Sequence, residues 1–250
     1  MMKSPAAVSG APAALIAPSP QCVDPGRGPL RGTGVSVQLT LYYAPIACSL
    51  VSYITLTEAG AAFEVRPLNF ARREHLSPEF LKINPRHRVP VLLIDDRPLL
   101  ETLAIQLWVA RQFPAARLLP EDPMQQLQAL SRMAWCASGI HPCLTPNALP
   151  ERYCDLPGSE ESVRRCARKL LLENYQIADD LLANRSWFFD HFTAVDAYFF
   201  WCFRRGQQFG VDVGAFQHCL AHFNRMSERA SVRQLLSYEA QVLEQFRRSA

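Results

Sequence analysis

Cys48 is the residue whose type and position carry the clearest chemistry in this chain of 250 residues. It stands just before Val51–Glu58, whose apolar pattern is helical, so it lies in the first turn of a predicted helix. The positive end of a helix dipole lowers the pKa of a nearby thiol and favours the thiolate. We therefore expect Cys48 to be a reactive thiol, and the alternative is a buried helix cysteine. Ser49, Tyr42 and Tyr43 are fallback donors.

A second segment with binding potential covers residues 84–102, Asn-Pro-Arg-His-Arg-Val-Pro-Val-Leu-Leu-Ile-Asp-Asp-Arg-Pro-Leu-Leu-Glu-Thr. Val89-Pro90 heads an apolar strand, where proline cannot donate a ladder hydrogen bond. If this bond is cis, the N–H and C=O of Val89 are free to pair with an extended peptide. Glu101 and Thr102, at a strand-to-helix junction, could then hold its ammonium and carboxylate groups. The alternative is a hairpin with an ordinary proline and a helix cap.

Predicted strands and helices position these two segments. Val35–Tyr43 and Phe63–Leu68 read as strands, and with the helix between them they form a right-handed unit with parallel strands. A short helix over Ser77–Ile83, the hairpin and a buried helix over Thr102–Phe113 follow. The order βαβαββα over residues 35–113 resembles a thioredoxin-like domain.

The chain after residue 113 has a different character. Residues 114–123 hold three prolines and are predicted to be a linker. A helix over Met124–Ile140 is predicted to end at His141, before Pro142 and Pro146. Further helices are predicted over Ser162–Leu182, over Ala197–Phe203 behind the capping-box-like pair Thr193 and Asp196, and in two amphipathic stretches near the C-terminus.

We therefore predict an α/β plus all-α protein. Its parts are a disordered Pro/Ala-rich tail over residues 1–34, a thioredoxin-like domain over 35–113, the linker, and an all-helical domain over 124–250. The composition, 49% hydrophobic and 20% charged with a net charge of +3, is that of an ordinary soluble globular protein. Scattered arginines do not indicate nucleic-acid binding, and no apolar run reaches the roughly 18 residues that span a membrane.

The eight cysteines form no Cys-x-x-Cys pair, which favours a reducing compartment, and we expect a cytoplasmic protein. We expect four of them to be buried free thiols: Cys136, Cys166, Cys202 and Cys219. His218 and His222 have a spacing that can chelate zinc, but no third ligand lies nearby, so we expect surface or interface histidines and no metal.

The order of these motifs resembles the glutathione transferase superfamily over residues 36–245. The Val-Pro pair, the hairpin, the Glu-Thr pair and the Thr-x-x-Asp cap carry the resemblance. Tyr-Tyr-Ala-Pro-Ile-Ala-Cys-Ser-Leu looks like the cysteine-containing segment of the bacterial beta class. The resemblance implies that Val89 pairs with the cysteinyl part of glutathione, and that Glu101 and Thr102 bind its γ-glutamyl end. It also implies that Cys48 stabilises or exchanges with its sulfur, assisted by His141.

Two arginines extend this implied site. Arg72, or its neighbour Arg73, lies where the family often places a lysine for the glycyl carboxylate. Arg88 replaces the more usual glutamine before Val89, and it could grip a carboxylate or crowd the site.

The resemblance implies an enzyme that conjugates glutathione, its co-substrate, to small hydrophobic electrophiles in detoxification, or one that exchanges thiols with it. It implies a homodimer, through the helix after Glu101 and the first helix of the helical domain. The alternative is a non-catalytic binding or regulatory scaffold, and a glutathione-dependent isomerase or dehalogenase would share the first domain.

Overall fold

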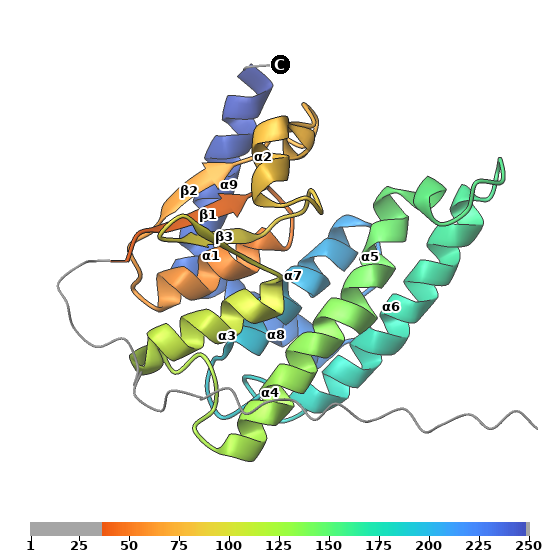
Figure 1. The fold of residues 1–250 in the computed structure, drawn as a ribbon. Coiled ribbons are helices and arrows are strands. Elements are labelled where there is room, and N and C mark those ends of the chain that lie inside the picture. Colours follow the sequence, from red (N-terminus) through yellow and green to blue (C-terminus); the bar gives the residue numbers. More distant parts are fainter. Residues whose placement is uncertain (1–36, 249–250) are drawn as a thin grey trace, which may run out of the picture. The chain divides into compact units, whose positions relative to one another are not determined.

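The computed structural model describes residues 37–248 (Figure 1), so the tail predicted over residues 1–34 lies outside the described residues. In the first part of the fold the elements are β1 (Leu39–Tyr43), α1 (Ser49–Glu58), β2 (Glu64–Pro67), α2 (Pro78–Ile83), β3 (Val91–Ile94), β4 (Arg97–Leu100) and α3 (Thr102–Gln112). The predicted βαβαββα order is confirmed, with a short 3₁₀ turn at Glu74–Leu76 before α2.

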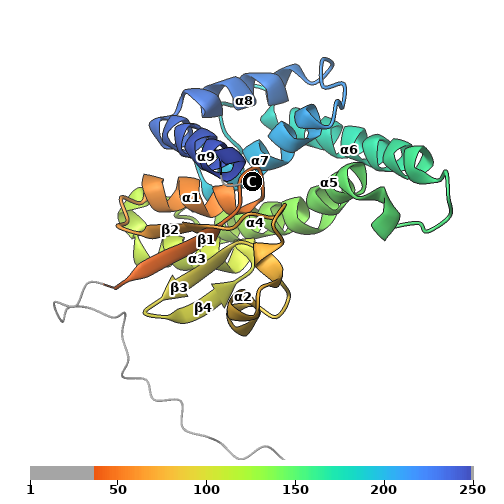
Figure 2. The ribbon, with the colours of Figure 1, turned by 90° about the horizontal axis from the view of Figure 1, so that it is seen from above.

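The four strands form one sheet in the order β2-β1-β3-β4. β1 runs parallel to β2 and antiparallel to β3, and β3 and β4 form the hairpin. Alternate residues of β1 face opposite sides, as strand geometry requires: Leu41 packs into the main core, and Tyr42 packs on Phe80 of α2. Figure 2 shows α1 between the sheet and α9, with α2 on the opposite face of the sheet.

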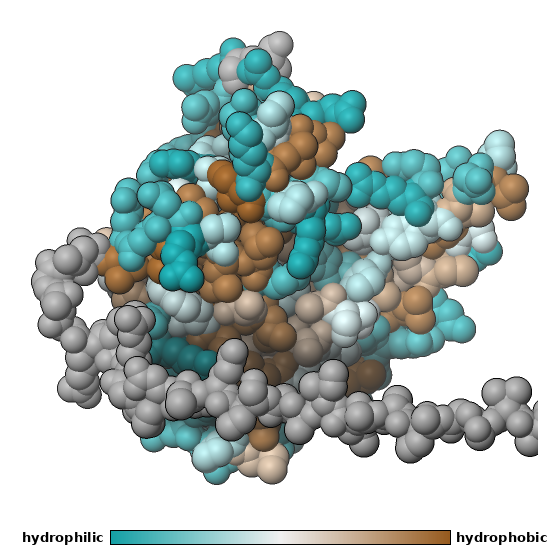
Figure 3. All heavy atoms as spheres, viewed as in Figure 1, coloured by the Kyte–Doolittle hydropathy of each residue, from teal (hydrophilic) through white to brown (hydrophobic). Residues whose placement is uncertain are grey.

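The second part is helical, as predicted. Its helices are α4 (Pro123–Trp135), α5 (His141–Ala148), α6 (Glu160–Leu182), α7 (Ala194–Gln208), α8 (Gln217–Glu228) and α9 (Ala230–Arg248). The apolar helix α7 is buried on nearly all sides, and its aromatic residues pack with Tyr175 of α6 and Phe223 of α8. On the face seen in Figure 3, hydrophobic residues gather between the sheet and the helices, while hydrophilic residues cover most of the outer surface. None of the helices within residues 37–248 combines the length and the apolarity needed to cross a bilayer.

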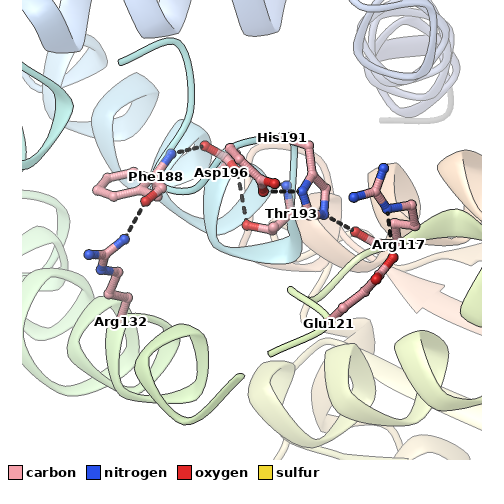
Figure 4. Close-up of polar contacts among 8 residues, drawn as sticks. Arg117, Glu121, Arg132, Phe188, His191, Thr193 and Asp196 are labelled. Carbon is pink, nitrogen blue, oxygen red and sulfur yellow. Dashed lines mark hydrogen bonds and ion pairs between the residues drawn. The ribbon is translucent and has the colours of Figure 1, made fainter. Parts of the chain in front are cut away.

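The start of α7 is fixed by a buried carboxylate. Asp196 closes a capping box with Thr193, accepting from its N–H at 2.8 Å and its hydroxyl at 3.0 Å. Its other oxygen accepts the N–H of Phe188 at 3.0 Å, while Arg132 donates to the carbonyl of Phe188 (Figure 4). The same Asp196 oxygen that accepts the Phe188 N–H also lies 3.0 Å from Nε2 of His222. The expectation of a surface or interface position is therefore wrong for His222, which is buried because it completes this carboxylate's hydrogen bonds.

The prediction that the first helix of the helical part ends at His141 is also wrong. A π-helical turn at Cys136–Ile140 follows α4, and α5 continues from His141 to Ala148. The π turn shifts the hydrogen-bond register, so Pro142 falls in the first turn of α5, where an N–H has no helical partner. The side chain of Asn147 donates to the carbonyl of Cys143 at 3.0 Å and stabilises the turn around Pro146.

All seven described cysteines are free. Cys136, Cys202 and Cys219 are buried, as expected, but Cys166 is exposed. The buried stripe of α6 runs through Ala167 and Leu171, so the preceding position faces solvent.

Candidate active site

Cys48 is placed by the turn that joins β1 to α1. It caps α1, its side chain is buried, and its Sγ–H donates to the carbonyl of Val89 at 3.3 Å. Burial raises the pKa of the Cys48 thiol to about 11; the negative charge of Glu101 acts in the same direction, and a hydrogen bond from Thr102 and the charge of Arg88 act against it. The expectation of a lowered pKa is wrong for this state, because desolvation outweighs the helix dipole.

The three fallback donors have structural partners. The hydroxyl of Ser49 accepts from the N–H of Ala44 at 3.0 Å and also lies 3.2 Å from that residue's carbonyl. The hydroxyl of Tyr42 accepts from Arg66, and that of Tyr43 donates to a carboxylate on α9. Among these four candidates, Cys48 is the one whose polar atom lies beside Val89.

Val89 is presented by a loop built around Asn84. The Val89-Pro90 bond is cis, which is the condition on which a free backbone edge at Val89 depends. The side chain of Asn84 accepts from the N–H of Arg86 at 3.0 Å and donates to the carbonyl of Arg88 at 2.7 Å. Within residues 37–248 the N–H of Val89 has no hydrogen-bond partner, and its carbonyl accepts only the weak S–H donor of Cys48. This backbone edge is therefore available to an extended peptide.

Glu101 and Thr102 lie at the start of α3, next to this edge. Glu101 has φ of 70°, a conformation that is rare for non-glycine residues and that clusters at functional sites. Its exposed carboxylate pairs with Arg86 at 2.5 Å, so a basic group already occupies the position expected for a ligand's ammonium. Thr102 is buried, and its side chain acts to lower the pKa of both Cys48 and Tyr198 of α7, against the effect of burial. Sequence reasoning missed Arg86, whose signal was the Asn-Pro-Arg turn itself.

His141 approaches the same place from the helical part of the fold. Its Nδ1 lies 3.4 Å from the hydroxyl of Tyr198, and its ring meets Trp201 edge-on with centroids 4.4 Å apart. Burial lowers the pKa of His141 to about 4, and the charges of Arg88 and Arg205 act in the same direction. His141 is therefore neutral at neutral pH. Sequence reasoning missed Tyr198 and Trp201, although both lie on the aromatic helix behind the capping box.

The two arginines of the predicted site differ in position. Arg88 is exposed, and its positive charge acts to lower the pKa of both Cys48 and His141. Arg72 is exposed in the loop after β2, where its N–H donates to the side chain of Asn69 at 3.3 Å. Its part in the site stays a prediction.

The described residues contain no group of three or more His, Cys, Asp or Glu side chains placed to hold a metal ion. His218 pairs with Asp179 at 2.9 Å, while His222 faces Asp196. The two histidines are therefore hydrogen-bonded to different carboxylates. The arrangement around Cys48 instead combines a backbone edge with an unpaired N–H among the described residues, a thiol donor and a neutral imidazole.

Comparisons with known proteins identify relatives of this chain. Residues 37–111 match the family model for the N-terminal domain of glutathione S-transferase. The chain is 29% identical over 205 residues to glutathione S-transferase GstA of Escherichia coli O157:H7, covering 80% of this chain and 98% of that protein.

Solved structures show the same likeness. A glutathione transferase homolog from Sulfitobacter, solved with bound glutathione, aligns with a TM-score of 0.76 at 28% identity, covering 81% of this chain and 98% of that one. The bacterial beta class glutathione S-transferase of Sphingomonas chungbukensis aligns with a TM-score of 0.71 at 30% identity, covering 80% and 98%.

Proposed function

The chain belongs to the glutathione transferase superfamily and is similar to the bacterial beta class, and on this premise we propose how its site handles glutathione and a second substrate. The protein is a glutathione transferase. The observation that carries the proposal is the Cys48 thiol at the carbonyl of Val89, beside a Val89 N–H without a partner. Glutathione is an extended peptide with a central cysteine, so pairing with Val89 brings its sulfur to Cys48.

Glu101 and Thr102 hold the γ-glutamyl end of the bound glutathione. The ammonium group of the ligand replaces Arg86 as the partner of the Glu101 carboxylate. Arg86 can then pair with the ligand's carboxylate, which the N-terminus of α3 also favours. Arg72 and Arg88 supply positive charge for the glycyl carboxylate, and the exposure of both side chains supports this role.

Cys48 acts as a hydrogen-bond donor to the glutathione sulfur. With its pKa raised to about 11, Cys48 is a thiol at neutral pH, and a thiol can donate to a thiolate. Its S–H moves from the Val89 carbonyl to the glutathione sulfur when the peptide binds. This state supports conjugation over thiol exchange, because exchange needs Cys48 itself as the thiolate.

His141 assists as a neutral group. An imidazole with a pKa of about 4 stays uncharged at neutral pH, so it can orient the sulfur by a hydrogen bond, while the proton of the glutathione thiol passes to water. The glutathione thiolate then attacks the electrophilic carbon, the new S–C bond forms, and the leaving group departs with its electron pair. His141 and Tyr198, which lie 3.4 Å apart, form one wall for a small hydrophobic electrophile, and their aromatic character supports that substrate class.

The assembly and cellular role follow from the same premise. We propose a homodimer formed through α3 and α4, which is supported by the exposed apolar residues Met124 and Leu127 on α4. A cytoplasmic role in detoxification fits the cysteines within residues 37–248, which are all free, because a reducing compartment preserves free thiols.

A conjugation assay with a chloronitrobenzene tests the proposal. Replacing Cys48→Ala removes one donor to the developing thiolate, so kcat should fall roughly ten- to a hundredfold with little change in glutathione affinity. The matched control is Cys166→Ala, which removes an exposed thiol on α6 and should keep wild-type kcat. Equal kcat for wild type and Cys48→Ala contradicts the assigned role of Cys48.

A further inference from the structure

The turn that leads into Cys48 is held by two helices from the helical part of the chain. Ile46, in the middle of this turn, has φ of 58°, which is unfavourable for a β-branched residue. Glu239 of α9 accepts the N–H of Ile46 at 2.7 Å, and the indole N–H of Trp201 of α7 donates to its carbonyl at 3.1 Å. Both backbone polar groups of Ile46 are therefore bound by side chains more than 150 residues away in sequence.

Glu239 is itself rigidly held. Its side chain is 4% exposed, and Arg204 donates to both of its oxygens, at 2.5 Å and 3.3 Å. The hydroxyl of Tyr43, at the end of β1, donates to it at 3.2 Å. A buried carboxylate with four donors, two of them charged, has a fixed geometry. It joins α9, α7, β1 and the turn before Cys48 at one point.

We propose that Glu239, together with Trp201, is a positioning residue for conjugation. By fixing Ile46 it holds Cys48, two residues later, with its thiol at the Val89 carbonyl where the glutathione sulfur lies. The inference rests on the proposed function and adds a residue that no part of the mechanism above uses.

Loosening the turn has a measurable consequence at Cys48. Burial is the largest cause of the raised pKa of this thiol, so exposing the thiol to water lowers its pKa. A larger fraction of Cys48 is then thiolate, and its alkylation becomes faster. The variants below leave unchanged the other groups that interact electrostatically with the thiol: Thr102, Glu101, Arg88, Tyr198 and Cys202.

The test compares Glu239→Gln and Trp201→Phe with the control Glu58→Gln. Glu58 also joins α1 to α9, through Arg229 and Ser231, but it lies at the opposite end of α1 from Cys48. Alkylation of Cys48 by iodoacetamide is followed across pH by mass spectrometry of its peptide, which needs no glutathione. Glutathione affinity and kcat are measured in parallel.

In Glu239→Gln and in Trp201→Phe, iodoacetamide should alkylate Cys48 at least about threefold faster than in wild type, and the pH midpoint of this reaction should be lower. The kcat of each variant should fall about tenfold, while its affinity for glutathione should stay within about twofold of wild type. Trp201→Phe changes no charge. Faster alkylation of Cys48 in this variant is therefore caused by the lost positioning of the turn and not by the lost negative charge of Glu239. Glu58→Gln should lower the melting temperature but keep the wild-type Cys48 profile.

The proposal is wrong if both variants fold and show the alkylation rate and the kcat of wild type. It is also wrong if Glu58→Gln changes the alkylation of Cys48 as much as Glu239→Gln does. If Glu239→Gln does not fold, Trp201→Phe decides the question alone. If wild-type protein neither binds nor conjugates glutathione, the proposed function fails while the alkylation profile still tests the positioning of Cys48.

Discussion

At the scale of single residues, burial decides the protonation state of the Cys48 thiol and of the His141 imidazole. Cys48 and His141 are each pushed toward the uncharged form, the first as a thiol and the second as a free imidazole. A helix N-terminus would have given the opposite result for Cys48, had the thiol been open to water. Both groups beside the expected position of the glutathione sulfur are therefore uncharged before glutathione binds.

The lowered pKa of His141 predicts a pH dependence of stability. In the unfolded chain His141 takes up a proton near its ordinary pKa of 6.5, whereas the folded protein resists protonation down to about 4. Its contribution is therefore present above pH 6.5 and is lost as pH falls through this window. Between about pH 7 and about pH 5 the loss is about 2 kcal/mol.

Urea unfolding of wild type and His141→Gln at both pH values measures this contribution. The carboxylates titrate alike in the two proteins, so the difference between their pH slopes isolates His141. If the two proteins show identical pH slopes, His141 is not a partly buried imidazole that stays neutral in the folded protein.

The residues near the peptide edge could be predicted from sequence, and their partners could not. Val89, Glu101 and Thr102 sit in a local motif, and the cis bond at Pro90 belongs to it. Glu239, by contrast, meets Ile46 across 193 residues, and no local pattern on α9 marks this contact. Burial of Cys48 depends on the same tertiary packing, which explains why its pKa shift was predicted with the wrong sign.

At the scale of elements, α7 connects the core to the site. Tyr198 and Trp201 reach His141 and the Ile46 turn from one face, while Gly206 allows Tyr175 of α6 to approach the helix closely. The apolar pattern of α7 predicted its burial, and the capping box predicted its start. The π turn before α5 could not be read from sequence, because Pro142 is compatible with either an end or a new first turn.

Gly206→Ala should destabilise the protein despite the higher helix propensity of alanine. A Cβ at this position would lie 2.1 Å from the hydroxyl oxygen of Tyr175, which is buried and donates to the carbonyl of Cys202. Overpacking of this kind costs about 1–3 kcal/mol, against about 1 kcal/mol gained in propensity.

Denaturant unfolding of Gly206→Ala measures the balance between these two effects. Adding Tyr175→Phe removes the closest clashing atom and should recover part of the loss. A Gly206→Ala protein as stable as wild type contradicts the close packing of α6 on α7.

At the scale of the whole molecule, the sheet part supplies the peptide edge and the helical part supplies His141, Trp201 and Glu239. The fold class could be predicted because each strand and helix carries its own periodicity. The division at residues 114–123 stays a prediction, as does the homodimer.

The central claim is that reduced glutathione binds along Val89 with its γ-glutamyl end at Glu101. Calorimetric titration of the purified protein with reduced glutathione, repeated on Glu101→Ala and on the control Glu121→Ala, tests it most directly. Glu121 is an exposed carboxylate in the segment between α3 and α4, where it pairs with Arg117. We predict binding in the micromolar to millimolar range for wild type and Glu121→Ala, and at least about tenfold weaker binding for Glu101→Ala, since the pair between its carboxylate and the ligand's ammonium group is lost. A folded wild-type protein that does not bind glutathione, or a Glu101→Ala variant that binds it as well as wild type, contradicts the account.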